Sequence, residues 1–237
     1  MPSGPISPMP YVVFTVLTYK PKSVLELGIG FGKWGHVFRE YLEITQSFDS
    51  PDRYRRENWS IKIDGIEGFE PYLTDAHRYI YSNIFIGDFC EIVPTLEPYD
   101  VIFMGDVLEH VPKDKAYKLL DDCLLKTNNA VVLTTPLGFC EQTDACGNEF
   151  ERHQSGWSIK DFDRYPHRVV KVMEGNYLFV VLMKPDAPTP ILNWHYHTQP
   201  MSTFRRVFRK VASRLLGWKL FIRFDNWFKT RIRHPGQ

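Results

Sequence analysis

The sequence predicts an α/β fold built on a mostly parallel sheet of seven strands. Short apolar segments alternate with helical ones, and this alternation is typical of β-α-β units whose strands are covered by helices on both faces. The alternation ends in two apolar segments joined by the turn 174–176, which predicts a closing antiparallel hairpin. The predicted strands are 23–27, 61–67, 83–87, 99–104 and 130–135, followed by hairpin strands 169–173 and 177–183.

Helices and loops are expected between these strands. The predicted helices are 31–44, 71–81, 113–126 and 158–164. The apolar and aromatic segment 11–19 is expected to be a helix or an extended segment that packs before the first strand. The polar segment 45–60 is predicted to be a long loop. His77 lies in a charged predicted helix, so we expect its side chain to be solvated.

The first predicted strand runs directly into a glycine-rich turn, in which Gly28, Gly30 and Gly32 occupy alternate positions. Because glycine lacks a Cβ, such a turn can bend sharply and let a ligand approach its backbone. The helix that follows would point free N–H groups and the positive end of its dipole at that ligand. The turn therefore predicts a nucleotide-type binding loop.

Two classes of nucleotide compete for this turn. The dinucleotide pattern G-x-G-x-x-G fits Gly30, Gly32 and Gly35, but it starts late after the strand. Its expected acid, about 20 residues later, would fall in the loop 45–60 rather than at a strand end. The other pattern starts earlier, with an acid at Glu26 before the glycines. The later strand ends decide between the two patterns.

Acidic residues follow three of the later strands, at Glu67, Asp88 and Asp106. In open α/β sheets the ligand binds at the carboxyl ends of the strands, so these side chains are expected beside the glycine turn. Carboxylates at that rim suit a positively charged, phosphate-free cofactor better than a pyrophosphate. The sequence thus indicates one site assembled from four separate segments.

These residues resemble those of the class I S-adenosylmethionine-dependent methyltransferases. The stretch from Glu26 to Gly32 is similar to the family's motif I, and later segments resemble its following strands in the same order. Those segments are 64–67, 87–89, 99–112 and 130–136. The resemblance covers roughly residues 20–184. It implies a Rossmann-like fold, S-adenosylmethionine as cofactor, and SN2 transfer of an activated methyl group to an aligned nucleophile.

The resemblance also implies roles for individual side chains. Glu67 would hold the ribose hydroxyls, since a carboxylate accepts hydrogen bonds from two neighbouring hydroxyls. Asp88 would contact the adenine amino group, and Phe89 would contact the adenine ring. The cofactor-binding residues implied in this way are Glu26, Gly28, Gly30, Gly32, Glu67, Asp88, Phe89 and Asp106.

A second constellation follows the fourth and fifth strands. Asp106, Glu109 and His110 come directly after the fourth strand, and His153 lies in the loop beyond the fifth. Neighbouring strands can bring these four side chains together. Two carboxylates and two imidazoles form a mixed oxygen and nitrogen set that suits Mg, Mn, Fe or Zn. The sequence therefore predicts a divalent metal site at these four residues.

This region also resembles the small-RNA 3′-end 2′-O-methyltransferases, in which an acid-x-x-Glu-His and a later His hold a divalent ion over two sugar hydroxyls. The spacing of His153, Trp157 and Phe162 repeats that family's spacing, whereas Asp106 stands where its members have Glu. Ubiquinone-pathway O-methyltransferases share the segment 108–111, so that segment does not fix the acceptor.

An alternative interpretation of the same residues needs no metal. Here His110 or His153 would deprotonate an acceptor hydroxyl as a general base, with Asp106 beside them as a third catalytic residue. The two interpretations differ in one measurable property, because full activity in EDTA would exclude the metal.

The chain is predicted to have three parts. Residues 1–184 form the methyltransferase domain, 185–200 a Pro-rich linker, and 201–237 a basic amphipathic helical extension. The extension carries ten Lys or Arg and one acid, a net charge of +9, which leaves −8 for the rest of a chain whose total is +1. We expect it to contact an anionic membrane surface, with packing on the body or on a second subunit, or RNA binding, as alternatives.

The function predicted from these features is S-adenosylmethionine-dependent methylation of a hydroxyl on a small molecule, glycan or glycolipid. The alternatives are an RNA 2′-O-methyltransferase with a divalent metal such as Mg or Mn, and a catalytically idle protein that binds S-adenosylmethionine. The four cysteines have no zinc-like spacing and are expected to be reduced thiols. We expect a cytoplasmic protein with peripheral contact to the membrane surface.

Overall fold

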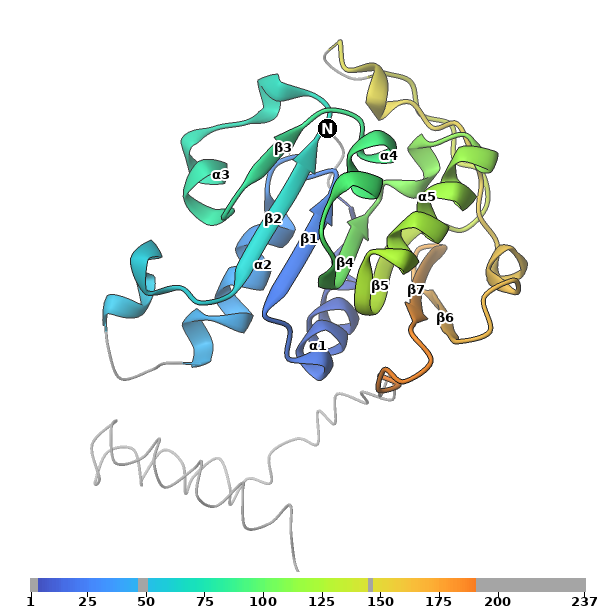
Figure 1. The fold of residues 1–237 in the computed structure, drawn as a ribbon. Coiled ribbons are helices and arrows are strands. Elements are labelled where there is room, and N and C mark those ends of the chain that lie inside the picture. The colour runs from blue at the N-terminus through green and yellow to red at the C-terminus, as the bar shows by residue number, and fades with distance from the viewer. Residues whose placement is uncertain (1–3, 47–50, 145–146, 191–237) are drawn as a thin grey trace, which may run out of the picture. The chain divides into compact units, whose positions relative to one another are not determined.

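The computed structural model describes residues 4–46, 51–144 and 147–190. Within them, one sheet has the strand order β3-β2-β1-β4-β5-β7-β6 (Figure 1). Its strands are β1 (Ser23–Leu27), β2 (Lys62–Glu67), β3 (Ile84–Ile86), β4 (Tyr99–Gly105), β5 (Thr127–Pro136), β6 (Arg168–Met173) and β7 (Tyr177–Met183). The first five strands pair in parallel, whereas β7 is antiparallel to β5 and β6. The predicted seven-stranded sheet with its closing hairpin is confirmed.

Two hydrophobic cores lie on opposite faces of this sheet, because alternate residues of a strand point to opposite sides. Ile102 and Met104 of β4 belong to one core, and Val101 and Phe103 belong to the other. The helices are α1 (Met9–Tyr19), α2 (Lys33–Leu42), α3 (Asp75–Ile80), α4 (Phe89–Ile92) and α5 (Lys113–Leu125). Helix α5 contributes to the first core and α1 and α2 to the second, so both faces are covered.

Several predicted elements differ in detail. The segment 11–19 is helical, as part of α1, rather than extended. The loop 45–60 contains short 3-10 turns at Pro51–Tyr54 and Arg56–Asn58. The predicted helix 71–81 begins only at α3, because Leu73 and Thr74 are extended and Thr74 caps the helix. The predicted helix 158–164 is a 3-10 turn, Ile159–Phe162.

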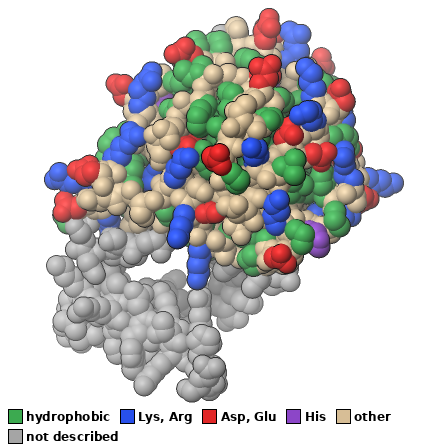
Figure 2. All heavy atoms as spheres, in the orientation of Figure 1, with side chains coloured by type: hydrophobic (Ala, Val, Ile, Leu, Met, Phe, Trp, Pro, Cys, Tyr) green, Lys and Arg blue, Asp and Glu red, His purple; other side chains and the backbone are tan. Residues whose placement is uncertain are grey.

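Charged side chains of both signs are interspersed over the described part of the face in Figure 2, without a large area of one sign. No helix among the described residues combines the length and the apolar character needed to cross a bilayer. The extension 201–237 and most of the linker lie outside the described residues. Their contacts with membrane, RNA or the protein body therefore stay predictions.

Candidate active site

A cavity of about 620 Å³ lies where the parallel strands end. This volume falls within the range of about 300–1,000 Å³ typical of sites for small molecules and cofactors. The cavity wall is formed by residues that follow β1, β2, β3, β4 and β5 and by the turn between β6 and β7. The predicted site residues in this wall are Gly28, Gly30, Glu67, Asp88, Phe89, Asp106, Glu109, His110 and His153. Glu26 and Gly32 are not part of it.

The glycine turn has the backbone conformation that the sequence predicted. Gly28, Gly30 and Gly32 have φ angles of 68°, 54° and 83°, which side chains disfavour. At Gly28 space adds a second reason, since a Cβ there would lie 2.7 Å from a methyl carbon of Val107. Gly32 is the N-cap of α2 and lies behind the turn. It therefore shapes the turn without lining the cavity.

Glu67 fixes the turn from the end of β2. Its two carboxylate oxygens accept the backbone N–H groups of Gly30, at 2.8 Å, and of Phe69, at 2.9 Å. Burial raises the pKa of Glu67, and these backbone hydrogen bonds oppose the rise. Because a carboxylate has about four acceptor sites, Glu67 keeps capacity for a ligand hydroxyl in the cavity.

Glu26 lies beneath the turn rather than in the cavity wall. Its side chain is 1% exposed and accepts a hydrogen bond of 2.7 Å from the Tyr81 hydroxyl. Burial raises the pKa of Glu26 to about 8. Glu26 is therefore a buried residue that supports the turn from the core. It does not line the cavity in which a direct contact with the cofactor was predicted.

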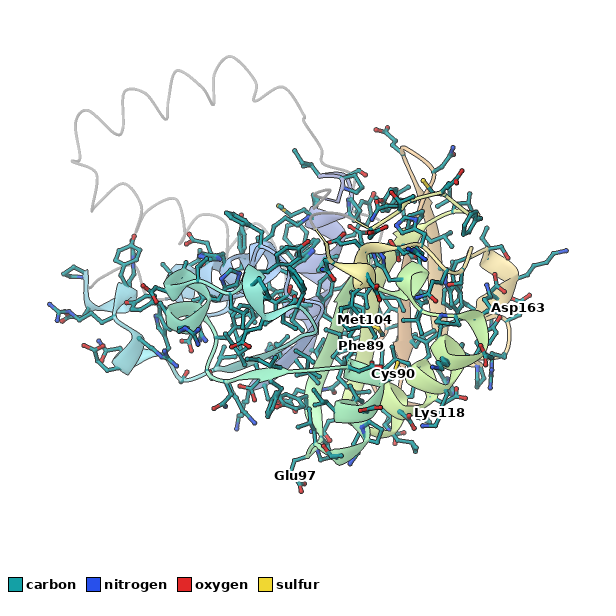
Figure 3. The ribbon with its side chains drawn as sticks, turned by 90° about the horizontal axis from the view of Figure 1, so that it is seen from above. Phe89, Cys90, Glu97, Met104, Lys118 and Asp163 are labelled. Carbon is teal, nitrogen blue, oxygen red and sulfur yellow. The ribbon has the colours of Figure 1, made fainter. Side chains whose placement is uncertain are left out.

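Asp88 and Phe89 follow β3, the strand that pairs with β2, and so lie in the part of the cavity wall next to Glu67. Asp88 is the N-cap of the short helix α4, which the sequence analysis missed, and accepts the N–H of Cys90 at 2.8 Å. An Asp followed by a short apolar run is the signal that would have found this helix. Phe89 packs against the core that contains Met104 (Figure 3). Both residues line the cavity, and their contacts with adenine stay predictions.

Three of the four predicted metal ligands come together. One ligand atom each of Glu109, His110 and His153 lies within 4.8 Å of the others. The two imidazole rings meet edge to face, with centroids 4.7 Å apart. The loop that carries His153 is tied to the β4 end, because Gln154 and Ser155 donate their backbone N–H groups to the Glu109 carbonyl.

The hydrogen bonds of the two histidines indicate which ring nitrogen carries the proton. Nδ1 of His153 lies 2.5 Å from the Cys140 carbonyl, and Nδ1 of His110 lies 3.3 Å from the Arg152 carbonyl. A carbonyl oxygen can only accept, so in the neutral rings each Nδ1 carries the proton. Each Nε2 then keeps a free lone pair. This arrangement is usual for histidines that ligate metals.

Burial governs the charges of this cluster. The pKa of Glu109 is raised to about 8 by burial and by the Asp106 carboxylate, although the Thr135 hydroxyl donates to it at 2.9 Å. The pKa of His110 is lowered to about 4 by burial and by His153. In the absence of a cation, neutral forms of these groups are therefore favoured.

Asp106 departs from the predicted set of four ligands. It lies in the cavity wall but outside the cluster of Glu109, His110 and His153. Its Oδ1 accepts the Thr134 hydroxyl at 3.2 Å, and its backbone φ of 57° is unusual for a residue with a side chain. Burial raises its pKa to about 6, opposed by the charge of Lys33. Sequence spacing placed Asp106 at the correct strand end but could not show where its carboxylate points.

The prediction that His77 is solvated is wrong. Its side chain is 1% exposed, and its Nε2 lies 3.1 Å from the carbonyl of Gly30 in the glycine turn. The spacing of Thr74 and His77, three residues apart at the start of α3, is the signal that sequence analysis passed over.

Comparison with known proteins completes the description. No protein-family model and no curated protein matches this chain. A SAM-dependent methyltransferase from Archaeoglobus fulgidus is 11% identical, with a TM-score of 0.52 over 75% of this chain and 91% of that one. A complex of DhpI with SAM and HEP is 16% identical, with a TM-score of 0.51 over 69% and 78%.

The N-terminal domain of EvdMO1, solved with SAH and D-fucose, is also 16% identical, with a TM-score of 0.51 over 76% of this chain and 83% of that one. At such identities the likeness concerns the fold, and it agrees with the strand order and closing hairpin described above. The chain therefore has the fold of the class I S-adenosylmethionine-dependent methyltransferases.

Proposed function

We propose that the chain is an S-adenosylmethionine-dependent methyltransferase whose acceptor is a hydroxyl of a small molecule or of a glycan or glycolipid. One observation carries the proposal. A single cavity joins the glycine turn, Glu67 and Asp88 to the cluster of Glu109, His110 and His153. A cofactor held by the first group and an acceptor held at the second would share one enclosed space.

The residues of the first group fit S-adenosylmethionine. Its sulfonium supplies an activated methyl group when bound. The described charged residues in the cavity wall are the acids Glu67, Asp88, Asp106, Glu109 and Glu151, with Lys33 as the only cation. This surplus of carboxylates favours a positively charged ligand and disfavours a pyrophosphate. The glycine backbone provides the close approach that a nucleoside needs.

For the acceptor end we propose that Glu109, His110 and His153 would hold a divalent ion such as Mg or Mn. One ring nitrogen of each histidine and the buried carboxylate form a suitable donor set. The alternative of a metal-free base is less favourable at His110, because a group with a pKa of about 4 is far from the value that makes an efficient base near neutral pH. A bound ion would lower the pKa of a hydroxyl that contacts it.

The acidic wall also bears on the class of acceptor. RNA 2′-O-methylation remains the second candidate, because three of the four residues that carry the resemblance to the small-RNA enzymes, Glu109, His110 and His153, lie together. Lys33 is the one Lys or Arg among the described residues of the wall, so phosphates would find few partners there, which favours a neutral acceptor over RNA. The EvdMO1 domain, which has a similar fold, was solved in the presence of D-fucose, and this supports a sugar as one class of acceptor to test.

The test is methyl transfer from labelled S-adenosylmethionine by the full chain. Acceptor panels would include neutral sugars, glycolipids in vesicles and RNA 3′ ends, each with Mn²⁺ or with EDTA. We expect transfer to a neutral hydroxyl compound that EDTA abolishes and Mn²⁺ restores. Full transfer in EDTA would exclude the metal. A chain that does not bind S-adenosylmethionine by calorimetry would contradict the proposal as a whole, whereas binding without transfer across the panel would favour the idle alternative.

A further inference from the structure

We propose that His77 is a positioning residue for the cofactor. Its Nε2–H donates to the carbonyl of Gly30 and so holds the glycine turn in the shape that accepts the nucleoside. His77 does not line the cavity, and nothing in the sequence pattern of the turn points to it. The inference rests on the proposed function, since it concerns how the same cofactor site is shaped.

The hydrogen bonds of His77 determine its tautomer. Nδ1 lies 3.0 Å from the backbone nitrogen of Thr74 and 2.9 Å from its hydroxyl oxygen. The Thr74 backbone N–H can only donate, so Nδ1 must accept. In the neutral ring the proton is then on Nε2, which lies 3.1 Å from the Gly30 carbonyl oxygen. The imidazole therefore connects the start of α3 to the glycine turn through two hydrogen bonds, one that it accepts from Thr74 and one that it donates to Gly30.

The peptide groups of Gly30 are held from two sides. The N–H donates to Glu67 at 2.8 Å, and the carbonyl accepts from His77. Gly30 has no side chain and a φ of 54°, so its backbone has alternatives that a bulkier residue would lack. With both groups occupied by buried partners, the turn is fixed before a ligand arrives.

The packing around His77 leaves the ring little freedom. A Cβ placed on Gly32 would lie 3.0–3.1 Å from ring atoms of His77, so the ring lies directly against the turn. Tyr81 lies four residues later, its ring nearly parallel to the imidazole, and donates to Glu26 beneath the turn. Tyr81 is the C-cap that follows α3, so the two ends of this helix contact the glycine turn through His77 and the buried Glu26 beneath it through Tyr81.

Two isosteric substitutions separate this role from helix capping. The side-chain amide of His77→Asn reaches the position of Nδ1, and its oxygen can still accept the Thr74 N–H. The longer amide of His77→Gln reaches the position of Nε2, and its NH₂ can still donate to Gly30. Titration calorimetry with S-adenosylhomocysteine, together with thermal melting of the full chain, would compare both variants with the wild type.

We expect both variants to melt at a lower temperature than the wild type, because each loses the buried ring. We expect His77→Asn to bind S-adenosylhomocysteine about three- to tenfold more weakly than the wild type, as loss of one hydrogen bond predicts. We expect His77→Gln to stay within about twofold of the wild type, because it keeps that bond. Equal affinity of wild type and His77→Asn, or equal losses in both variants, would overturn the inference. Failure of the wild type to bind at all would contradict the proposed function instead.

A second measurement needs no variant. Long-range ¹H–¹⁵N NMR spectra of the imidazoles report which ring nitrogen carries the proton. We expect His77 to be protonated at Nε2 and unprotonated at Nδ1. A ring protonated at Nδ1 alone could not donate to Gly30 and would contradict the inference even if the variants did not fold.

Discussion

The two ends of the cavity hold their carboxylates in opposite ways. At the cofactor end, Glu67 is bound by two backbone N–H groups, so its orientation is set by the fold. At the acceptor end, Glu109 accepts from one side-chain hydroxyl, and a ring nitrogen each of His110 and His153 lies within 4.8 Å of its carboxylate. Burial raises the pKa of both carboxyls, but only Glu109 lies among ligand atoms that a cation can bridge.

This difference indicates that the side chains at the cofactor end are already fixed by the fold. The side chains at the acceptor end, in contrast, are arranged so that they could bind a cation. Removal of a side chain from one end should leave the other end's ligand unaffected. The experiments below test that independence, beginning with the largest expected effect.

Glu109→Gln should abolish most turnover while cofactor binding survives. The substitution keeps the shape of the side chain and removes the negative charge that would bind the ion. We expect turnover to fall at least about 100-fold, as for loss of a group that activates the acceptor. Affinity for S-adenosylhomocysteine should stay within about threefold. Glu40→Gln, an exposed acid on α2 outside the cavity wall, is the control for the change of charge. Turnover of Glu109→Gln near the wild-type value would remove the cluster from the mechanism.

Glu67→Gln should have the converse effect. Its amide NH₂ would face one of the two backbone N–H groups that now donate to the carboxylate. Loss of a hydrogen bond to a charged group predicts about 10- to 100-fold weaker binding of S-adenosylhomocysteine by calorimetry. Binding of Mn²⁺, followed by electron paramagnetic resonance, should not change. The exposed Glu70→Gln provides the control. A Glu67→Gln variant that lost Mn²⁺ as well would show that the two ends are coupled.

The stability of the metal-free protein should depend on Glu109 in a defined direction. Its pKa of about 8 exceeds the ordinary value of 4.5, so between these values the folded state binds more protons than the unfolded state. The stability contribution is therefore full below about pH 4.5 and lost as the pH rises through about 8.

In EDTA, the wild type and Glu109→Gln should melt at similar temperatures near pH 5, and the wild type should melt several degrees lower near pH 9. Mn²⁺ should raise the melting temperature of the wild type more at the higher pH, because it replaces the proton. Differential scanning calorimetry would measure both effects. Identical pH profiles for the two proteins would contradict the raised pKa of Glu109.

Tyr81→Phe should give the smallest effect on binding. It removes the hydroxyl that donates to the buried Glu26, and loss of such a bond costs about 1–3 kcal/mol of unfolding free energy. Affinity for S-adenosylhomocysteine should change by less than about threefold, since Glu26 does not line the cavity. Urea denaturation and calorimetry would measure the two quantities. A loss of affinity greater than tenfold would return Glu26 to the direct role that the sequence predicted.

The alternation of apolar segments was enough to predict the sheet and its hairpin, and strand ends were enough to predict Glu67, Asp88 and Glu109 in one site. Such patterns show which edge of the sheet a residue reaches. They do not show the orientation of a buried side chain or its hydrogen-bond partners. Glu26 was expected to contact the cofactor, whereas it contributes no atom to the cavity wall and is held by Tyr81. Asp106 was expected to join the metal cluster, whereas it accepts from Thr134 in the cavity wall outside that cluster.

His77 shows the same limit of sequence patterns for a residue that was expected to be exposed and is buried. Its charged neighbours indicated an exposed helix, but α3 places this one face against the glycine turn. The two partners are 47 residues apart in the sequence, so the contact has no local signal. The membrane contact predicted for the extension 201–237 stays a prediction.

The most direct test of a shared cavity is a crystal structure of the full chain with S-adenosylhomocysteine and Mn²⁺, with anomalous diffraction to locate the metal. The account predicts the nucleoside at the glycine turn and Glu67, the sulfur facing the cluster, and an anomalous peak among Glu109, His110 and His153. A nucleoside bound outside this cavity, or a sulfur directed away from the cluster, would contradict the account.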